Sequence, residues 1–105
     1  MPAVKQPPSA HLRSGRIFIH TELDEHGLPN AVRALGEDVF FCASDYPHEP
    51  KHEFEEALTQ LWAHPELSAT AKRKIVRDNA IRMYQLDDAA LRAALARPDA
   101  AAPAR

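Results

Sequence analysis

The residues best suited to chemistry lie in segment 44–48, which reads Ser-Asp-Tyr-Pro-His and directly follows an apolar run. Asp45 carries a carboxylate that could bind a divalent metal or accept a proton from metal-bound water. His48 could orient that carboxylate, protonate a substrate or cap a following helix. Pro47 keeps Tyr46 out of the helical region, so the chain stays extended before it turns. The alternative is an ordinary turn, in which Asp45 accepts backbone N–H bonds and Pro47 ends the segment.

Other histidines and carboxylates are weaker candidates for a site. His48 and His52 are four residues apart, a spacing that binds metal on one face of a helix. Pro50 lies between them and disfavours a helix there, which argues against a local two-histidine site. Four further polar side chains follow the first apolar run: His20, Glu22, Asp24 and His26. A solvated loop is the simpler interpretation of that group.

The remaining candidate residues are each explained without chemistry. Cys42 lies inside an apolar run and is predicted to be a small buried hydrophobe rather than a nucleophile. The basic run at residues 72–74 is interrupted by Asp78 a few positions later, so we interpret it as a solvated helix face. Asn79 falls on the apolar stripe of a predicted helix, which indicates a buried amide that hydrogen-bonds a neighbouring loop.

Composition excludes several classes of protein. The chain has 105 residues, room for one small domain, and a formal net charge of −2, so it has no overall basic field to hold nucleic acid or anionic lipid. A lone cysteine excludes an internal disulfide and a cysteine-based zinc site. No apolar run approaches the roughly 20 residues of a membrane span, and the N-terminus lacks the apolar region of a secretory signal. We therefore expect a cytoplasmic protein with neither nucleic-acid nor membrane partners.

The elements that must position Asp45 begin with a strand, a helix and a second strand. The apolar runs 17–19 and 39–43 are rich in β-branched and aromatic residues and predict two strands. Because continuous apolar runs are typical of parallel sheets, we expect both faces of these strands to be buried. An amphipathic helix that begins near Leu28 lies between them, with Pro29 in its first turn and Gly36 just past its end. The pattern predicts one βαβ unit.

Helices are expected to fill the rest of the chain. The pattern becomes helical near His52 and stops at Pro65. Ser68 is a suitable N-cap for the next helix, and Asp87 or Asp88 for a last, Ala-rich one. Two parallel strands do not make a stable sheet by themselves, and their edges need partners. The sequence therefore predicts a slice of a larger α/β fold, or a subunit that completes itself by association.

Four short motifs together resemble a known family. Gly-Arg-Ile precedes the first strand, Leu-Gly-Glu-Asp precedes the second, Ser-Asp-Tyr-Pro-His follows it, and Asn-Ala-x-Arg-x-Tyr-x-Leu closes the helical region. From about Pro8 to Leu86 the chain resembles the C-terminal end of the amidohydrolase-2 family. These are TIM-barrel, metal-dependent hydrolases and decarboxylases related to aminocarboxymuconate-semialdehyde decarboxylase.

The resemblance implies an α/β fold, the C-terminal fragment of a (β/α)8 TIM barrel, with residues 17–21 as its seventh strand and 39–43 as its eighth. Asp45 then matches the family's strand-eight aspartate, a metal ligand or the base that activates metal-bound water, and His48 matches a supporting histidine. The implied cofactor of the complete barrel is a divalent metal, zinc first and manganese second. The polar group that follows the first strand would face the mouth of the barrel.

The family's metal centre also uses a His-x-His pair after the first strand and histidines after middle strands, none of which this sequence contains. A complete barrel needs roughly 250 residues. We therefore expect the C-terminal portion of a hydrolase or decarboxylase for a small carboxylated or cyclic substrate, inactive as this chain alone. The alternative is a non-catalytic α/β fragment that persists by self-association or with a complementing chain. The expected organisation is an extended arm over 1–15, the partial barrel over 16–96 and a disordered tail over 97–105.

Overall fold

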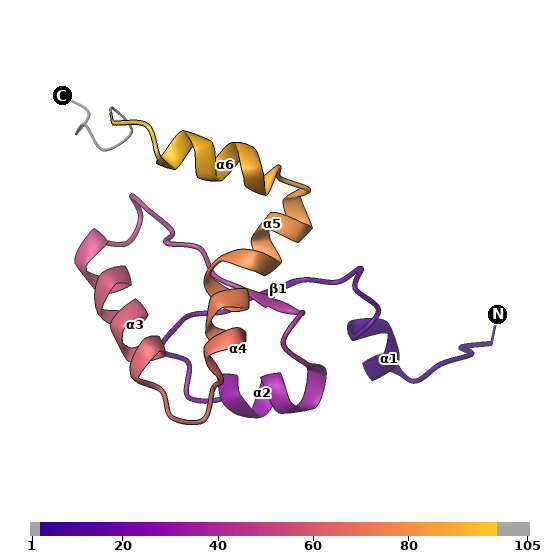
Figure 1. The fold of residues 1–105 in the computed structure, drawn as a ribbon. Coiled ribbons are helices and arrows are strands. Elements are labelled where there is room, and N and C mark those ends of the chain that lie inside the picture. The colour runs from indigo at the N-terminus through magenta and orange to yellow at the C-terminus, as the bar shows by residue number, and fades with distance from the viewer. Residues whose placement is uncertain (1–2, 99–105) are drawn as a thin grey trace.

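The computed structural model describes residues 3–98. Its helices and strands follow one another along the chain (Figure 1): α1 (Pro8–Leu12), β1 (Ile19–His20), α2 (Leu28–Leu35), β2 (Phe40–Phe41), α3 (Lys51–Ala63), α4 (Ala69–Arg73), the π-helical turn η1 (Lys74–Asp78), α5 (Asn79–Tyr84) and α6 (Asp88–Leu95). Within these residues, every helix is too short or too polar to cross a bilayer.

The first half of the fold is the predicted strand–helix–strand unit, so the α/β class is confirmed. β1 pairs with β2 in parallel, with Ile19 opposite Phe40. The Ile19 N–H donates to the Val39 carbonyl at 2.8 Å, and the Thr21 N–H donates to the Phe41 carbonyl at 2.9 Å. Each strand spans two residues, fewer than the apolar run that predicted it.

Helix α2 has the start and end that the sequence predicts. Pro29 occupies the first turn, where its missing N–H needs no partner. Gly36 ends the helix at φ +92°, a backbone conformation that glycine adopts without strain, and donates its N–H to the Val32 carbonyl at 2.8 Å. Leu28 and Val32 are buried, so α2 packs its apolar stripe into the core.

The later helices also begin where the sequence places their caps. The Ser68 hydroxyl accepts the Ala71 N–H at 3.0 Å, and the Asp87 carboxylate accepts the Ala90 N–H at 3.0 Å. The helix that starts after Ser68 is interrupted by η1 before it continues as α5. The core joins buried apolar side chains from both halves of the chain: Leu23, Leu28, Val32, Val39, Phe40, Leu61, Leu67, Ala71 and Ile75.

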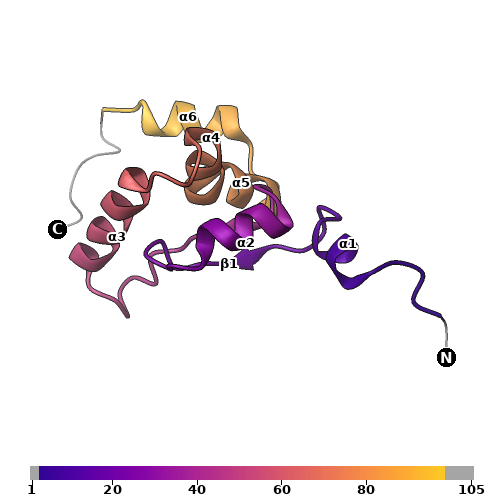
Figure 2. The same ribbon diagram turned by 90° about the horizontal axis from the view of Figure 1, so that it is seen from below.

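Helices cover one face of the strand pair. Ile19, Phe40 and Cys42 lie in the core or pack against it, and in Figure 2 α4, α5 and α6 lie above β1, with α2 nearer the viewer. His20 and Phe41 are paired across the two strands and lie on the other face, where their rings meet edge to face at 5.7 Å. The His20 side chain is 41% exposed. The prediction of strands buried on both faces is therefore wrong for the described residues, since His20 is exposed and Phe41 is only half-buried.

The N-terminal arm departs from the extended conformation expected over residues 1–15. Pro8–Leu12 forms a short helix that follows Pro7, whose backbone is extended. Proline is well suited to the first helical position, so the two adjacent prolines start a helix instead of preventing one. Arg13 then donates to the Ala34 carbonyl at 2.9 Å, which ties the arm to the end of α2. Most of the tail expected over 97–105 lies outside the described residues.

Candidate functional site

Asp45 lies just beyond the carboxyl end of β2, at the edge of the sheet where the loop after β1 also emerges. Both loops share this edge because the strands are parallel. Ligands of parallel α/β folds bind at such edges, where loops present polar side chains above the strand ends. The βαβ unit therefore places Asp45 where the sequence analysis expects chemistry.

Asp45 and His48 form a hydrogen-bonded pair. The His48 Nδ1 atom lies 3.0 Å from Asp45 Oδ2, and both side chains are well exposed, at 84% and 63% respectively. Asp45 has φ +50°, in the left-handed region that aspartate tolerates better than most residues. The Tyr46–Pro47 bond is cis, and the Glu49 N–H donates to the Asp45 carbonyl at 3.1 Å. This tight turn brings together the two residues that the sequence analysis singled out.

The turn is built differently from the ordinary one considered above. In that alternative, the Asp45 carboxylate accepts backbone N–H bonds. Instead the Ser44 hydroxyl accepts the Tyr46 N–H at 3.3 Å, and the Asp45 carboxylate faces the His48 ring. Ser44 was not a candidate in the sequence analysis, although serine in this role is common in turns. Its hydroxyl serves the backbone and leaves the carboxylate available.

A carboxylate bonded to Nδ1 of an imidazole fixes the ring's orientation and leaves Nε2 to donate or accept a proton. The same carboxylate oxygens are ordinary metal ligands. Because both groups are exposed, their attraction is screened by water and contributes little to stability. The pair can therefore carry chemistry more readily than it can hold the fold together.

A metal centre needs more than this pair supplies. Among residues 3–98 no three histidine, cysteine, aspartate or glutamate side chains converge in a way that could hold a metal ion. A catalytic zinc is usually held by three protein ligands. Asp45 and His48 are two donors that already bond each other, so these residues do not by themselves fit the metal that the family resemblance implies.

The loop after β1 does not gather its four polar residues into one site. His20 Nδ1 lies 4.0 Å from Glu22 Oε1, at the open face of the sheet. Glu22 and Asp24 line a hollow of about 270 Å³ together with Glu49 and Glu53. His26 lines a second hollow, of which Asp24 is also part. Buried Leu23 anchors this loop in the core, and neither hollow is lined by all four polar residues.

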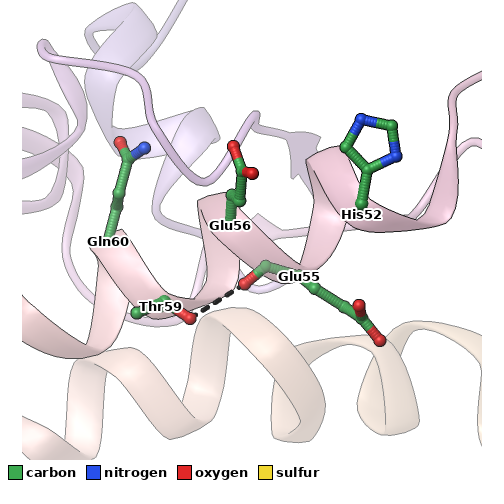
Figure 3. Close-up of a pocket in the computed structure, with 5 residues that line it drawn as sticks. All are labelled: His52, Glu55, Glu56, Thr59 and Gln60. Atoms are coloured by element: carbon green, nitrogen blue, oxygen red, sulfur yellow. Dashed lines mark hydrogen bonds between the residues drawn. The ribbon is translucent and has the colours of Figure 1, made fainter.

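His52 is also separate from the Asp45–His48 pair. It begins a row of side chains along α3 that line a surface hollow of about 460 Å³ (Figure 3): His52, Glu55, Glu56, Thr59 and Gln60. The Thr59 hydroxyl donates to the Glu55 carbonyl of its own helix at 2.9 Å. Pro50 is the N-cap of α3, which leaves His48 outside the helix, as the sequence predicts.

Cys42 is half-buried against the core. Desolvation by burial raises the pKa of its thiol to about 11, so the thiolate that would act as a nucleophile is scarce at neutral pH. No basic partner of the thiol is found in the described part of the chain. This agrees with the interpretation of Cys42 as a small hydrophobic residue.

The basic run at residues 72–74 is engaged within the fold. Lys72 donates to the Trp62 carbonyl at 2.8 Å. Lys74 lies 2.9 Å from an Asp38 oxygen and 3.5 Å from a Glu37 oxygen, and its hydrogen bond holds the pKa of Asp38 below its usual value. The sequence analysis missed this link, although the acidic pair after Gly36 and the basic run are complementary in charge.

No protein-family model, curated protein or solved structure matches this chain. The expectation of a family thus rests on the four motifs and on the fold that carries them.

Proposed function

We propose that this chain is the C-terminal part of an amidohydrolase-type (β/α)8 barrel. In this proposal it contributes the last two strands and the strand-eight aspartate, Asp45, to a metal-dependent hydrolase or decarboxylase for a small carboxylated or cyclic substrate. It has no activity until the other strands complete the site. The observation that carries the proposal is the placement of the Asp45–His48 pair at the carboxyl end of a parallel strand pair that helices cover on one face.

In residues 3–98 the helices cover only one face of the strand pair, which favours a barrel and not a doubly wound sheet as the complete fold. In a barrel, helices form an outer ring and the inner faces of the strands turn toward one another. In a doubly wound sheet, helices cover both faces. The face that carries His20 and Phe41 corresponds in the barrel to the interior, where side chains from the other strands would bury it.

The unpaired edges and the incomplete donor set support the same proposal. β1 and β2 each have one side with no strand partner in residues 3–98, and a barrel removes such edges by closure. Asp45 brings one of the donors that a metal centre needs. The other donors belong, in this proposal, to strands that this sequence does not contain.

The test joins this chain to the first six βα units of an amidohydrolase-2 enzyme whose own last two units have been removed. Both zinc content and turnover of that enzyme's substrate are measured, because the resemblance leaves Asp45 as a ligand or a base. We expect Asp45→Asn to lose bound zinc, turnover or both. Asp24→Asn removes the same charge from the neighbouring loop and serves as the matched control. An Asp45→Asn chimera that equals its parent in both measurements would contradict the proposal.

The isolated chain provides a second check. Because three donors do not converge, calorimetric titration is expected to show no submicromolar zinc binding. Tight binding that Asp45→Ala abolishes would mean that the chain builds a metal site without further strands, against the proposal.

A non-catalytic fragment that persists by self-association is the second candidate. It is favoured by large apolar side chains that stay exposed, with Trp62 at 48% and Leu95 at 77%. Sedimentation velocity over a range of concentrations distinguishes it, because self-association makes the sedimentation coefficient rise with concentration. A monomer with one sharp, concentration-independent unfolding transition would exclude this candidate.

A further inference from the structure

The π-helical turn η1 changes which backbone groups are free to bond β2. The Asn79 N–H donates to the Lys74 carbonyl, five residues back, instead of to the Ile75 carbonyl, four residues back as in an α-helix. The Ile75 carbonyl instead accepts the Cys42 N–H at 3.1 Å. The irregular turn therefore supplies the acceptor for the first residue beyond β2.

The side chain of Asn79 bonds the same strand at two other points. Asn79 is fully buried, and its Nδ2 donates to the Glu37 carbonyl and to the Phe40 carbonyl, each at 2.8 Å. An amide NH2 has two donors, and here each one meets a backbone carbonyl. The Ile75 carbonyl and the Asn79 amide together hold β2 before it starts, within it and just after it ends.

We propose that Asn79 is a positioning residue for Asp45. By fixing β2 from Glu37 to Cys42, the turn at Ile75 and Asn79 sets the direction in which the chain leaves the strand, three residues before Asp45. The inference rests on the proposed function insofar as Asp45 is the group that must be placed. Its structural content is independent of any metal.

Asparagine at position 79 fits the role of holding β2 better than it fits the role of filling the core. An apolar side chain at position 79 would leave the buried Phe40 carbonyl and the partly buried Glu37 carbonyl without this donor, and proteins strongly avoid unpaired buried carbonyls. An ionised aspartate would aim acceptors at both carbonyls. The Asn79 Oδ1 atom has no hydrogen-bond partner within the described residues, so what the amide supplies here is its two donors.

Amide hydrogen exchange of the full chain, followed by NMR, tests the inference. The Cys42 N–H is compared with the amides of α2, which do not bond this turn. In Asn79→Ala, we expect protection of Cys42 to fall at least ~10-fold more than protection of α2, a difference of about 1.4 kcal/mol. The matched control is Leu61→Ala, which opens a cavity in α3 at an equally buried position and should lower both sets of amides by the same factor.

The backbone resonances of Asp45 and His48 give a readout that a loss of global stability would not move. They should shift in Asn79→Ala and stay in place in Leu61→Ala. An unchanged ratio of Cys42 to α2 protection, or resonances at Asp45 and His48 that do not move, would overturn the inference.

The wild-type chain decides the matter if Asn79→Ala does not fold. Its Cys42 amide should be protected to within ~10-fold of the α2 amides if the turn holds the strand end firmly. Exchange of Cys42 at the rate of an unstructured amide would overturn the inference. None of these measurements involves zinc or activity. A negative result in the chimera would therefore leave this inference standing, and a negative exchange result would leave the proposed function standing.

Discussion

Replacing Ile75 by alanine is the sharpest test of where the core lies. Ile75 is completely buried, and it belongs to η1, the turn that lies against β2. It packs in the cluster that contains Val32 from α2 and Leu61 from α3. A truncation there removes contacts to both halves of the chain at once.

The expected loss follows from the atoms removed. Isoleucine to alanine deletes three carbons, and each buried carbon contributes about 0.8 kcal/mol, which gives about 2.4 kcal/mol. The cavity left behind adds about 1 kcal/mol, since the surrounding side chains relax only in part. The total of about 3 to 4 kcal/mol is a large share of the roughly 5 to 15 kcal/mol that stabilises an ordinary small domain.

Urea unfolding followed by circular dichroism measures the change in the free energy of unfolding. Leu95→Ala is the matched control, because it deletes the same number of carbons from a side chain that is 77% exposed, and it should cost less than about 0.5 kcal/mol. Equal losses in the two variants would refute the reasoning. They would mean that Ile75 does not join the two halves of the chain in one core.

Three further predictions follow from particular contacts. Ser68→Ala removes the cap of α4 and should lower the free energy of unfolding by about 1 kcal/mol in urea titrations, whereas Thr70→Ala, which caps no helix, should lower it by less. In the folded chain Asp38 has a lower pKa than in the unfolded chain, because Lys74 hydrogen-bonds its carboxylate. Its contribution to the free energy of unfolding is therefore present above about pH 4 and lost as the pH falls through the pKa of the folded state. Asp38→Asn should accordingly be less stable than the wild type at pH 7 and equally stable near pH 2. The difference at pH 7 should not exceed about 1 kcal/mol, since water screens the exposed pair. A difference that persists at low pH would contradict this. Cys42, whose pKa is raised to about 11 by burial, should react with a thiol reagent at pH 8 about 100-fold more slowly in the folded chain than in urea, and rate measurements from pH 8 to 11 should show acceleration throughout. A folded-state rate equal to that in urea would show that the thiol is not buried.

Local signals in the sequence were sufficient for most of the elements. Pro29 marks the start of α2 and Gly36 its end, and Ser68 and Asp87 cap the starts of α4 and α6. These signals can be read from the sequence because they act within one helical turn. The expectation of an extended arm is wrong at Pro8–Leu12, because Pro8 begins α1. The interruption at η1 has no clear local signal, because Lys74–Asp78 contains no glycine or proline to mark a break in a helix.

The candidate site shows the same division. The sequence placed Asp45 after a buried strand and placed His48 within reach of it. It also predicted that Asn79 would bond a neighbouring loop, and the amide does so at the Glu37 carbonyl. It did not predict that Glu22 and His26 would line different hollows with Asp24 common to both, because that depends on how Leu23 is anchored in the core.

The sequence by itself determined the α/β order of elements, the helix ends and the segment best suited to chemistry, because each depends on neighbours along the chain. Only the tertiary structure decided that helices cover one face of the strands, that the Asp45 carboxylate faces His48, and that η1 frees a carbonyl to bond Cys42. These features join residues far apart in sequence or depend on side-chain rotamers. Their energies arise only when the whole chain has packed, so no local pattern encodes them.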